Sequence, residues 1–188
     1  MITATQLINQ LRTYTPADAQ ERESVQKIIQ WLQTNPVLTY PENKTGHLTA
    51  DCWLLSPDYS QVLLTLHHKF QRWIQVGGHV DAGESLTQAG VREAREESGI
   101  ENIRLLSPNI FDLDVHWVDS YPGEEHYHYD IRFLAQASSW NYVISPESDD
   151  LRWFTPAQVE ALVATGTNQI NATLGRMTQK WRDFLAKM

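Results

Sequence analysis

Charged residues gather in one short stretch of the chain, GGHVDAGESLTQAGVREAREESGI, at residues 77–100. On a helix with about 100° of rotation per residue, Glu93, Glu96 and Glu97 occupy positions i, i+3 and i+4, so their carboxylates share one face. A helix turns small and apolar residues toward its own protein. The same face contains such residues: Leu86, Ala89 and Gly90. We therefore expect the carboxylates to point inward or into a cleft.

An ordinary solvated helix is the alternative interpretation, with Arg92 and Glu96 as a salt bridge one turn apart. The arginine-before-glutamate order is the less favourable one, and an exposed pair contributes only about 0.3–0.5 kcal/mol. Three like charges on one face cost free energy unless a cation binds there, and Mg²⁺ or Mn²⁺ prefers such hard oxygen ligands. Before the helix, Gly77, Gly78 and Gly83 allow close approach of the backbone to phosphate. The stretch therefore predicts metal-assisted chemistry on a phosphorylated substrate.

The spacing of these residues resembles the Nudix box of the Nudix hydrolase superfamily. Every fixed position is filled: Gly78, Glu84, Arg92-Glu93-Ala94, Glu96-Glu97 and Gly99-Ile100. The resemblance implies an α/β protein with the Nudix fold, an α/β/α sandwich around a mixed sheet. It also implies that water attacks phosphorus in a diphosphate bond, within a nucleoside diphosphate linked to another moiety. Mg²⁺ or Mn²⁺ would be the cofactor, neutralising the phosphate oxygens and activating the water.

The resemblance also implies a role for each residue of the box. Glu93, Glu96 and Glu97 would be the metal ligands, and Arg92 would orient these carboxylates. Glu84 would brace the preceding loop by pairing with an arginine. The two fixed glycines would serve the turns: Gly78 and Gly99.

A base must also accept a proton from the attacking water. Glu93 or Glu97 is a candidate for this role, and so is a carboxylate outside the helix. In the later segment ISPESDDLRWF, Glu147 lies in an acidic loop just before an expected strand, where relatives in the superfamily often carry such a residue. A purely solvated acidic loop is the equally simple interpretation of that segment.

Two later segments carry ionisable side chains on one strand face, FDLDVHWV and EEHYHYDIRF. Half-exposed antiparallel strands alternate in this way by default, so a solvent-facing sheet surface is one interpretation. Histidine is unusual on such a surface, however, and we favour strands that line the substrate cleft. The expected substrate contacts are Asp112, Asp114, His79, His126 and His128. The histidines would contact phosphate or a further metal, and a zinc site is the weaker version of that hypothesis.

Elements that position these residues follow from periodicity and turn signals. Helices are expected at residues 3–14, 15–35, 85–98, 155–164 and 168–187, and strands at 46–56, 61–69, 73–76, 103–106, 109–118, 126–137 and 151–154. The second helix would be capped by Thr15, with Pro16 at its first position. We expect an N-terminal helical extension at residues 1–44, a Nudix domain at 45–166 and a C-terminal helix packed on it at 167–188.

Composition limits the partners that the chain can have. Its 188 residues carry a formal net charge of −8, which argues against binding nucleic acid or an anionic membrane. One cysteine, Cys52, allows no intramolecular disulfide, and no apolar run is long enough to cross a bilayer. We expect a cytoplasmic protein whose partner is a small-molecule diphosphate, with a homodimer as a further possibility.

Two other functions remain open at this level. An enzyme like isopentenyl diphosphate isomerase shares the fold, but it depends on a catalytic cysteine in a strand context that Cys52 in TADCWLLS does not match. A ligand sensor without catalysis is the other alternative. Such modules tend to lack the carboxylates of the box, whereas this chain retains all of them.

Overall fold

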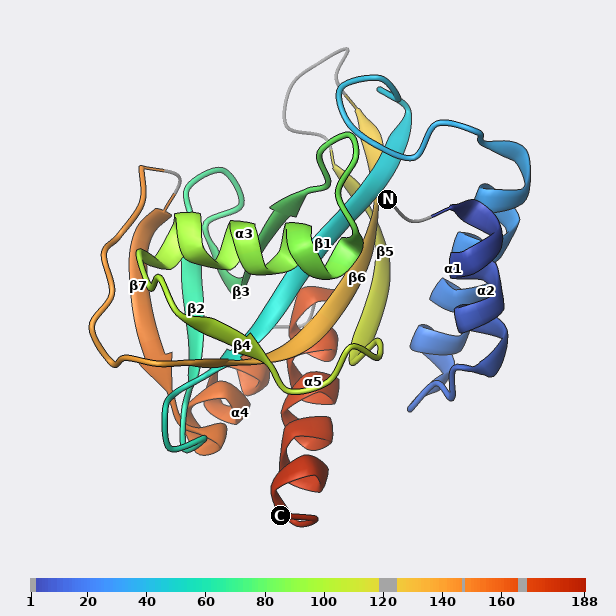
Figure 1. Ribbon diagram of the computed structural model, residues 1–188. Helices are drawn as coiled ribbons and strands as arrows, with labels where there is room; N and C mark the ends of the chain where they lie inside the picture. The colour runs from blue at the N-terminus through green and yellow to red at the C-terminus, as the bar shows by residue number, and fades with distance from the viewer. Residues whose placement is uncertain (1–2, 119–124, 147, 166–168) are drawn as a thin grey trace.

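Seven strands form one mixed sheet, which has helices on both of its faces (Figure 1). The computed structural model describes residues 3–118, 125–146, 148–165 and 169–188. The strands are β1 (Gly46–Leu55), β2 (Val62–His67), β3 (Arg72–His79), β4 (Ile103–Leu105), β5 (Asp112–Val118), β6 (His126–Ala137) and β7 (Ser148–Phe154). The helices are α1 (Ala4–Thr13), α2 (Ala19–Thr34), α3 (Leu86–Ser98), α4 (Pro156–Ala164) and α5 (Gln169–Leu185). The expected α/β class, with its mixed sheet between helices, is confirmed.

The central strand β1 connects the two halves of the sheet. The strand order is β4-β6-β1-β3-β2-β7, and β5 pairs with the outer side of β6. The pairing of β1 with β6 is parallel, whereas β1 pairs antiparallel with β3. Side chains of successive residues in a strand point to opposite faces. Leu48, Ala50 and Cys52 therefore lie on one face of β1, and His47, Thr49 and Asp51 on the other.

Two apolar layers cover the sheet. On the first face, α3 packs with Ala89 and Ala94 against Ala50 and Cys52, and apolar residues of α1 and α2 extend this layer toward β5. On the second face, α4 and α5 cover Trp53, whose ring meets Trp181 of α5 edge to face. Within the described ranges, none of these helices has the length and apolarity that a bilayer span requires.

Several element boundaries differ from those expected, including the start of α2 and the end of β3. The cap of α2 is Asp18 rather than Thr15, because its side chain accepts a hydrogen bond from the Glu21 backbone at 2.7 Å. Strand β3 does not stop before the glycine pair. Gly77 and Gly78 pair with Asp51 and Ala50 of β1, so they belong to the sheet and not to a loop.

A buried ion network lies where β5 and β6 meet α5. Asp112 is fully buried, and its carboxylate accepts hydrogen bonds from Arg176 Nε at 2.8 Å, Lys180 Nζ at 2.9 Å and Arg132 Nη1 at 3.0 Å. Burial alone would raise the pKa of Asp112, but Arg176 and the other cations outweigh it and lower that pKa. Asp112 is therefore an ionised anchor for α5.

Asp114, two residues along β5, is also enclosed. It accepts hydrogen bonds from Ser24 of α2 at 3.3 Å and from Thr173 of α5 at 3.1 Å. The expectation that Asp112 and Asp114 contact substrate is therefore wrong in this structure. The alternation placed both on the correct face of the sheet, but helices cover that part of it.

Removing the negative charge of Asp112 leaves three neighbouring cations without their shared buried anion: Arg132, Arg176 and Lys180. We predict that Asp112→Asn lowers the free energy of unfolding by about 3–5 kcal/mol at pH 7, measured by urea denaturation. Asp183→Asn is the matched control, because Asp183 is exposed and bonds only Gln179 of its own helix among the contacts described here. Equal losses in the two variants would contradict the anchoring role.

The effect of pH follows from the lowered pKa of Asp112. A carboxyl whose pKa is lower in the folded state stabilises the fold above its unfolded pKa, about 4. The difference between wild type and Asp112→Asn should therefore stay constant from pH 7 to about pH 4. It should shrink at lower pH, as Asp112 of the folded wild type takes up a proton.

Candidate active site

Helix α3 begins and ends at residues that fix its position. Ser85 caps its first turn by accepting a hydrogen bond from the Gln88 backbone, and the Gln88 side chain accepts one from the Ser85 backbone N–H. The helix ends at Ser98, and its C-cap Gly99 has a φ of 67°, in the left-handed region that glycine adopts without steric cost. These two caps fix where α3 begins and ends.

Arg92 connects the loop before α3 with the carboxylates on the helix. Its guanidinium donates two hydrogen bonds of 2.9 Å to Glu84, one of 2.8 Å to Glu93 and one of 3.1 Å to Glu96. It also donates to the backbone carbonyl of His79 at the end of β3, at 2.9 Å. Hydrogen bonding to Glu84 raises the pKa of Arg92, and the same bond lowers the pKa of Glu84. One cation thus holds the loop, the strand and two glutamates together.

The three glutamates of the helix face differ in exposure. The side chain of Glu93 is 14% exposed and that of Glu96 is 60% exposed, whereas Glu97 is buried. A side chain at position 78 would place its Cβ 2.6 Å from the carboxyl carbon of Glu93, so glycine leaves the room that this carboxylate occupies. Carboxylates such as these three are the hard oxygen donors that Mg²⁺ and Mn²⁺ prefer.

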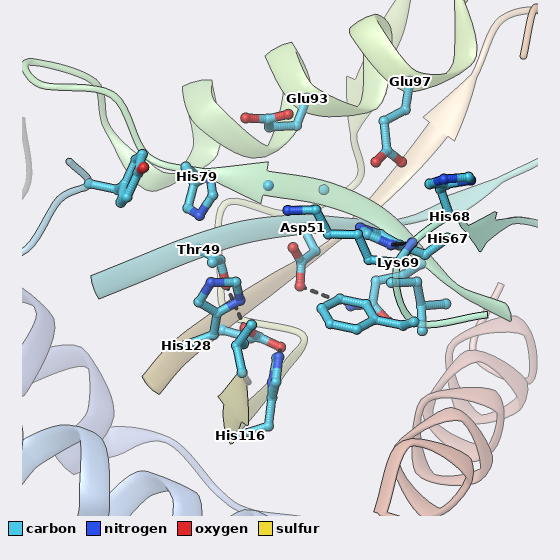
Figure 2. A pocket seen from close by; sticks show the side chains of 18 of the residues that line it. Thr49, Asp51, His67, His68, Lys69, His79, Glu93, Glu97, His116 and His128 are labelled. Carbon is cyan, nitrogen blue, oxygen red and sulfur yellow. Dashed lines mark hydrogen bonds and ion pairs between the residues drawn. The ribbon is translucent and has the colours of Figure 1, made fainter. Parts of the chain in front are cut away.

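All three glutamates line a cavity of about 780 Å³. Figure 2 shows Glu93 and Glu97 pointing from α3 toward β3, with Asp51 and His128 on the other side of that strand. The turn between β2 and β3 contributes Lys69 to the cavity wall. The cavity therefore combines carboxylates, imidazoles and an ammonium group, a set that can hold a cation and a polyanion together.

Sheet geometry explains why so many ionisable groups reach this cavity. The register of β1 with β6 places polar side chains beside one another in three successive pairs: His47 with His128, Thr49 with Asp130, and Asp51 with Arg132. Strand β5 adds His116, which pairs with His128. Because all of these residues share one face, they form a polar stripe that continues from the buried ion network to the cavity.

The predicted site residues fall into three groups. His79, His126 and His128 line the cavity, as do the three glutamates of the helix. Asp112 and Asp114 do not line it, for the reason given above. Glu147, proposed as a base, lies outside the described residues.

Sequence reasoning missed Asp51, which lines the cavity and is buried. Burial and the neighbouring charge of Asp130 raise the pKa of Asp51. Asp130 accepts hydrogen bonds from Thr49 and from Arg132, and its own pKa is lowered because His116 and Arg132 outweigh the effect of burial. A signal for Asp51 was present, because polar and apolar residues alternate in HLTADC as they do in HYHYDIRF.

Comparisons with known proteins agree with this geometry. The family model for the NUDIX domain matches residues 45–174. A NUDIX family hydrolase from Clostridium perfringens is similar in structure, with a TM-score of 0.56, 24% identity, and coverage of 74% of this chain and 97% of that chain. An Ap4A hydrolase from C. elegans has a TM-score of 0.57 and 21% identity, over 75% of this chain and 98% of its own.

A third similar structure is the MutT protein from Methanosarcina mazei Go1. Its TM-score is 0.57 at 18% identity, and the match covers 78% of this chain and 99% of that protein. At these identities the structural likeness shows a shared fold. A search of curated protein sequences gives no significant match.

The close approach of β3 to β1 at Gly77 allows a test of whether this position needs glycine. A Cβ at position 77 would lie 2.1 Å from Asp51 Oδ1 and 2.5 Å from Asp51 Cα. We predict that Gly77→Ala lowers the free energy of unfolding by about 1–3 kcal/mol, because the strands must move apart.

Gly175→Ala is the matched control for this substitution. Gly175 lies in α5, and an alanine Cβ there would contact Val163 of α4 at an ordinary distance of 3.6 Å. Alanine in place of glycine stabilises a helix by up to about 1 kcal/mol. Denaturant titration of both variants should give changes of opposite sign. A neutral or stabilising Gly77→Ala would show that the strands do not need glycine at this position.

Proposed function

This chain belongs to the NUDIX domain family, and we propose that it hydrolyses a diphosphate bond in a nucleoside diphosphate linked to another moiety. Membership of the family and the complete box make it a hydrolase acting on phosphorus anhydrides. The observation that carries the proposal is the connection of Arg92 to Glu84, Glu93 and Glu96 at the wall of a cavity. Arg92 thus orders two of the carboxylates that would hold the cation.

Glu93, Glu96 and Glu97 would hold Mg²⁺ or Mn²⁺. Such an ion, when bound, neutralises non-bridging phosphate oxygens and lowers the pKa of a bound water. Glu97 supplies a buried carboxylate, Glu93 a half-buried one, and Glu96 one that solvent reaches. Arg92 positions Glu93 and Glu96 and is a positioning residue in this scheme.

Three carboxylates of the cavity could take the proton of the attacking water. Glu93 and Glu97 are the candidates on α3, and Asp51 is a candidate outside the helix. Asp51 suits the role because burial raises its pKa, so that it accepts a proton more readily near neutral pH than an ordinary aspartate. Gln75 Nε2 donates to Asp51 at 3.0 Å and fixes the orientation of its carboxyl group.

The cavity supports a substrate of nucleotide size. Its volume of about 780 Å³ lies within the range of small-molecule sites. Tyr40, Phe70 and Ile74 give it apolar surfaces against which a base or another flat group can pack, and Lys69 offers a charge for phosphate. One of the similar structures is an Ap4A hydrolase, which is consistent with a nucleotide substrate.

Cys52 argues against the isomerase alternative. Its side chain is fully buried, and Sγ lies 3.2 Å from the carbonyl oxygen of Gly90, to which it donates. Burial raises the pKa of this thiol, so it is not a reactive thiolate. Its position under α3 makes Cys52 a packing residue between helix and sheet.

Turnover of a panel of diphosphates with Mg²⁺ or Mn²⁺ tests the proposal. Reaction in ¹⁸O-labelled water, with products identified by mass spectrometry, shows which phosphorus water attacks. We predict that Glu97→Gln lowers kcat on the order of 100-fold or more, because it removes a charge that the metal needs. Glu96→Gln should act in the same direction.

Glu101→Gln is the matched control, since Glu101 is an exposed glutamate three residues after the helix end at Ser98. It should retain the kcat of the wild type. If no diphosphate turns over with either metal, while a nucleotide still raises the melting temperature, the ligand-sensor function replaces the hydrolase.

A further inference from the structure

Four histidine side chains meet at the outer end of the polar stripe. Ring nitrogens of His47, His79, His126 and His128 all lie within 4.8 Å of one another. We infer that these four imidazoles bind one transition metal ion, with Zn²⁺ the favoured ion, at a site separate from the glutamates of α3. None of the four histidines occupies a fixed position of the box, so the site does not need the box carboxylates, although three of the four histidines line the same cavity as those carboxylates.

The register of three adjacent strands brings these rings together. His47 of β1 lies beside His128 of β6, and His126 precedes His128 by two residues on the same face. On the other side of β1, His79 of β3 is the partner of Thr49, two residues after His47. Side chains two residues apart in a strand share a face, so all four rings project from the same side of the sheet.

His47 is prepared as a metal ligand. Its Nδ1 lies 3.0 Å from the carbonyl oxygen of Asn43, which can only accept, so Nδ1 carries the proton. The lone pair of the neutral ring is then on Nε2. This atom is buried and has no hydrogen-bond partner among the described residues. In metal-bound histidines, a backbone carbonyl commonly accepts a hydrogen bond from one ring nitrogen and so orients the other nitrogen toward the metal.

The spacing of the other nitrogens suits a small ion. His126 Nε2 and His128 Nε2 are 2.9 Å apart. In a tetrahedral zinc site with bonds of about 2.0–2.1 Å, neighbouring nitrogens are separated by roughly 3.3 Å. The range from 2.9 Å up to the 4.8 Å limit of the cluster brackets this distance, so small side-chain rotations can close the shell.

Two further features favour neutral, ordered rings. Burial lowers the pKa of His47 to about 4 and that of His128 to about 2. A metal binds the neutral form of imidazole. Tyr40 stacks on the His79 ring with 4.8 Å between centroids, which holds that ring against the cluster.

The donor atoms select the metal. Four nitrogens suit Zn²⁺, Co²⁺, Ni²⁺ or Cu²⁺, whereas Mg²⁺ and Mn²⁺ prefer oxygen. Four protein ligands also complete a tetrahedral shell, as in structural zinc sites. Because imidazoles add no negative charge, the ion would keep its double positive charge beside a cavity of an otherwise acidic chain, where it attracts polyanions.

A second group, His116, His128 and Asp130, shares one histidine with the first. Its carboxylate is already engaged, because Asp130 accepts hydrogen bonds from Thr49 Oγ1 at 2.5 Å and from Arg132 Nη2 at 2.6 Å. A metal there would have to displace these bonds. The group of four histidines is therefore the better site.

Titration of protein without a histidine tag with Co²⁺ tests the site, because tetrahedral Co²⁺ absorbs visible light. We expect the visible absorption of tetrahedral Co²⁺ to saturate at one equivalent, Zn²⁺ to abolish it, and Zn²⁺ to raise the melting temperature. His47→Gln and His126→Gln should each weaken Co²⁺ binding by at least about tenfold. His126 is half-buried, so its variant remains informative if replacement of the buried His47 prevents folding.

Matched controls are His116→Gln, from the second group, and His68→Gln, whose side chain is 69% exposed. Both should bind Co²⁺ as the wild type does. A wild type with no visible absorption and no response of its melting temperature to Zn²⁺ would overturn the site. Loss of binding in His116→Gln but not in His126→Gln would also overturn it.

Discussion

The parallel pairing of β1 with β6 is the contact on which the candidate site depends. Ten consecutive residue pairs fix its register. Because side chains alternate between faces, a slip of one residue would move every polar group of one strand to the face that packs under α3. The correct register instead gathers them in one stripe, and β5 widens it: His116 stands beside His128, and Asp114 beside Asp130.

Arg132 lies at the point where this stripe passes from the protein interior to the cavity. It is buried and bonds Asp112 on the interior side, and Asp51 and Asp130 on the cavity side. Burial of an arginine is costly, and the surrounding carboxylates compensate for it. The same carboxylates gain a fixed orientation, so an interaction needed for folding also orders the wall of the cavity. The guanidinium group of Arg132 therefore contributes both to the stability of the fold and to the order of the cavity wall.

Local signals in the sequence were sufficient to predict helix α3 and the face on which its carboxylates lie. Capping residues, helical period and the spacing of the box are all contained within residues 77–100. The alternation in β5 and β6 likewise predicted which residues share a face. It could not predict that α5 covers Asp112, because this depends on a contact between residues 64 positions apart. For the same reason the sequence could not predict that His47 and Asp51 lie beside β6, since the partner of a strand is set by tertiary structure.

The pairing of β1 with β6 also has a consequence for how the molecule is made. Thr49 and Asp130 are 81 residues apart in the chain, so their contact closes a long loop and costs more entropy than any helix or hairpin. We therefore expect α3 and the β1–β2 hairpin to be able to form without β6, whereas the opposite wall of the cavity cannot. On a ribosome, the chain would carry its complete box well before it had a cleft in which to use it. A ligand that contacts both walls would then bind the fully folded protein and not a chain in which β6 has not yet paired.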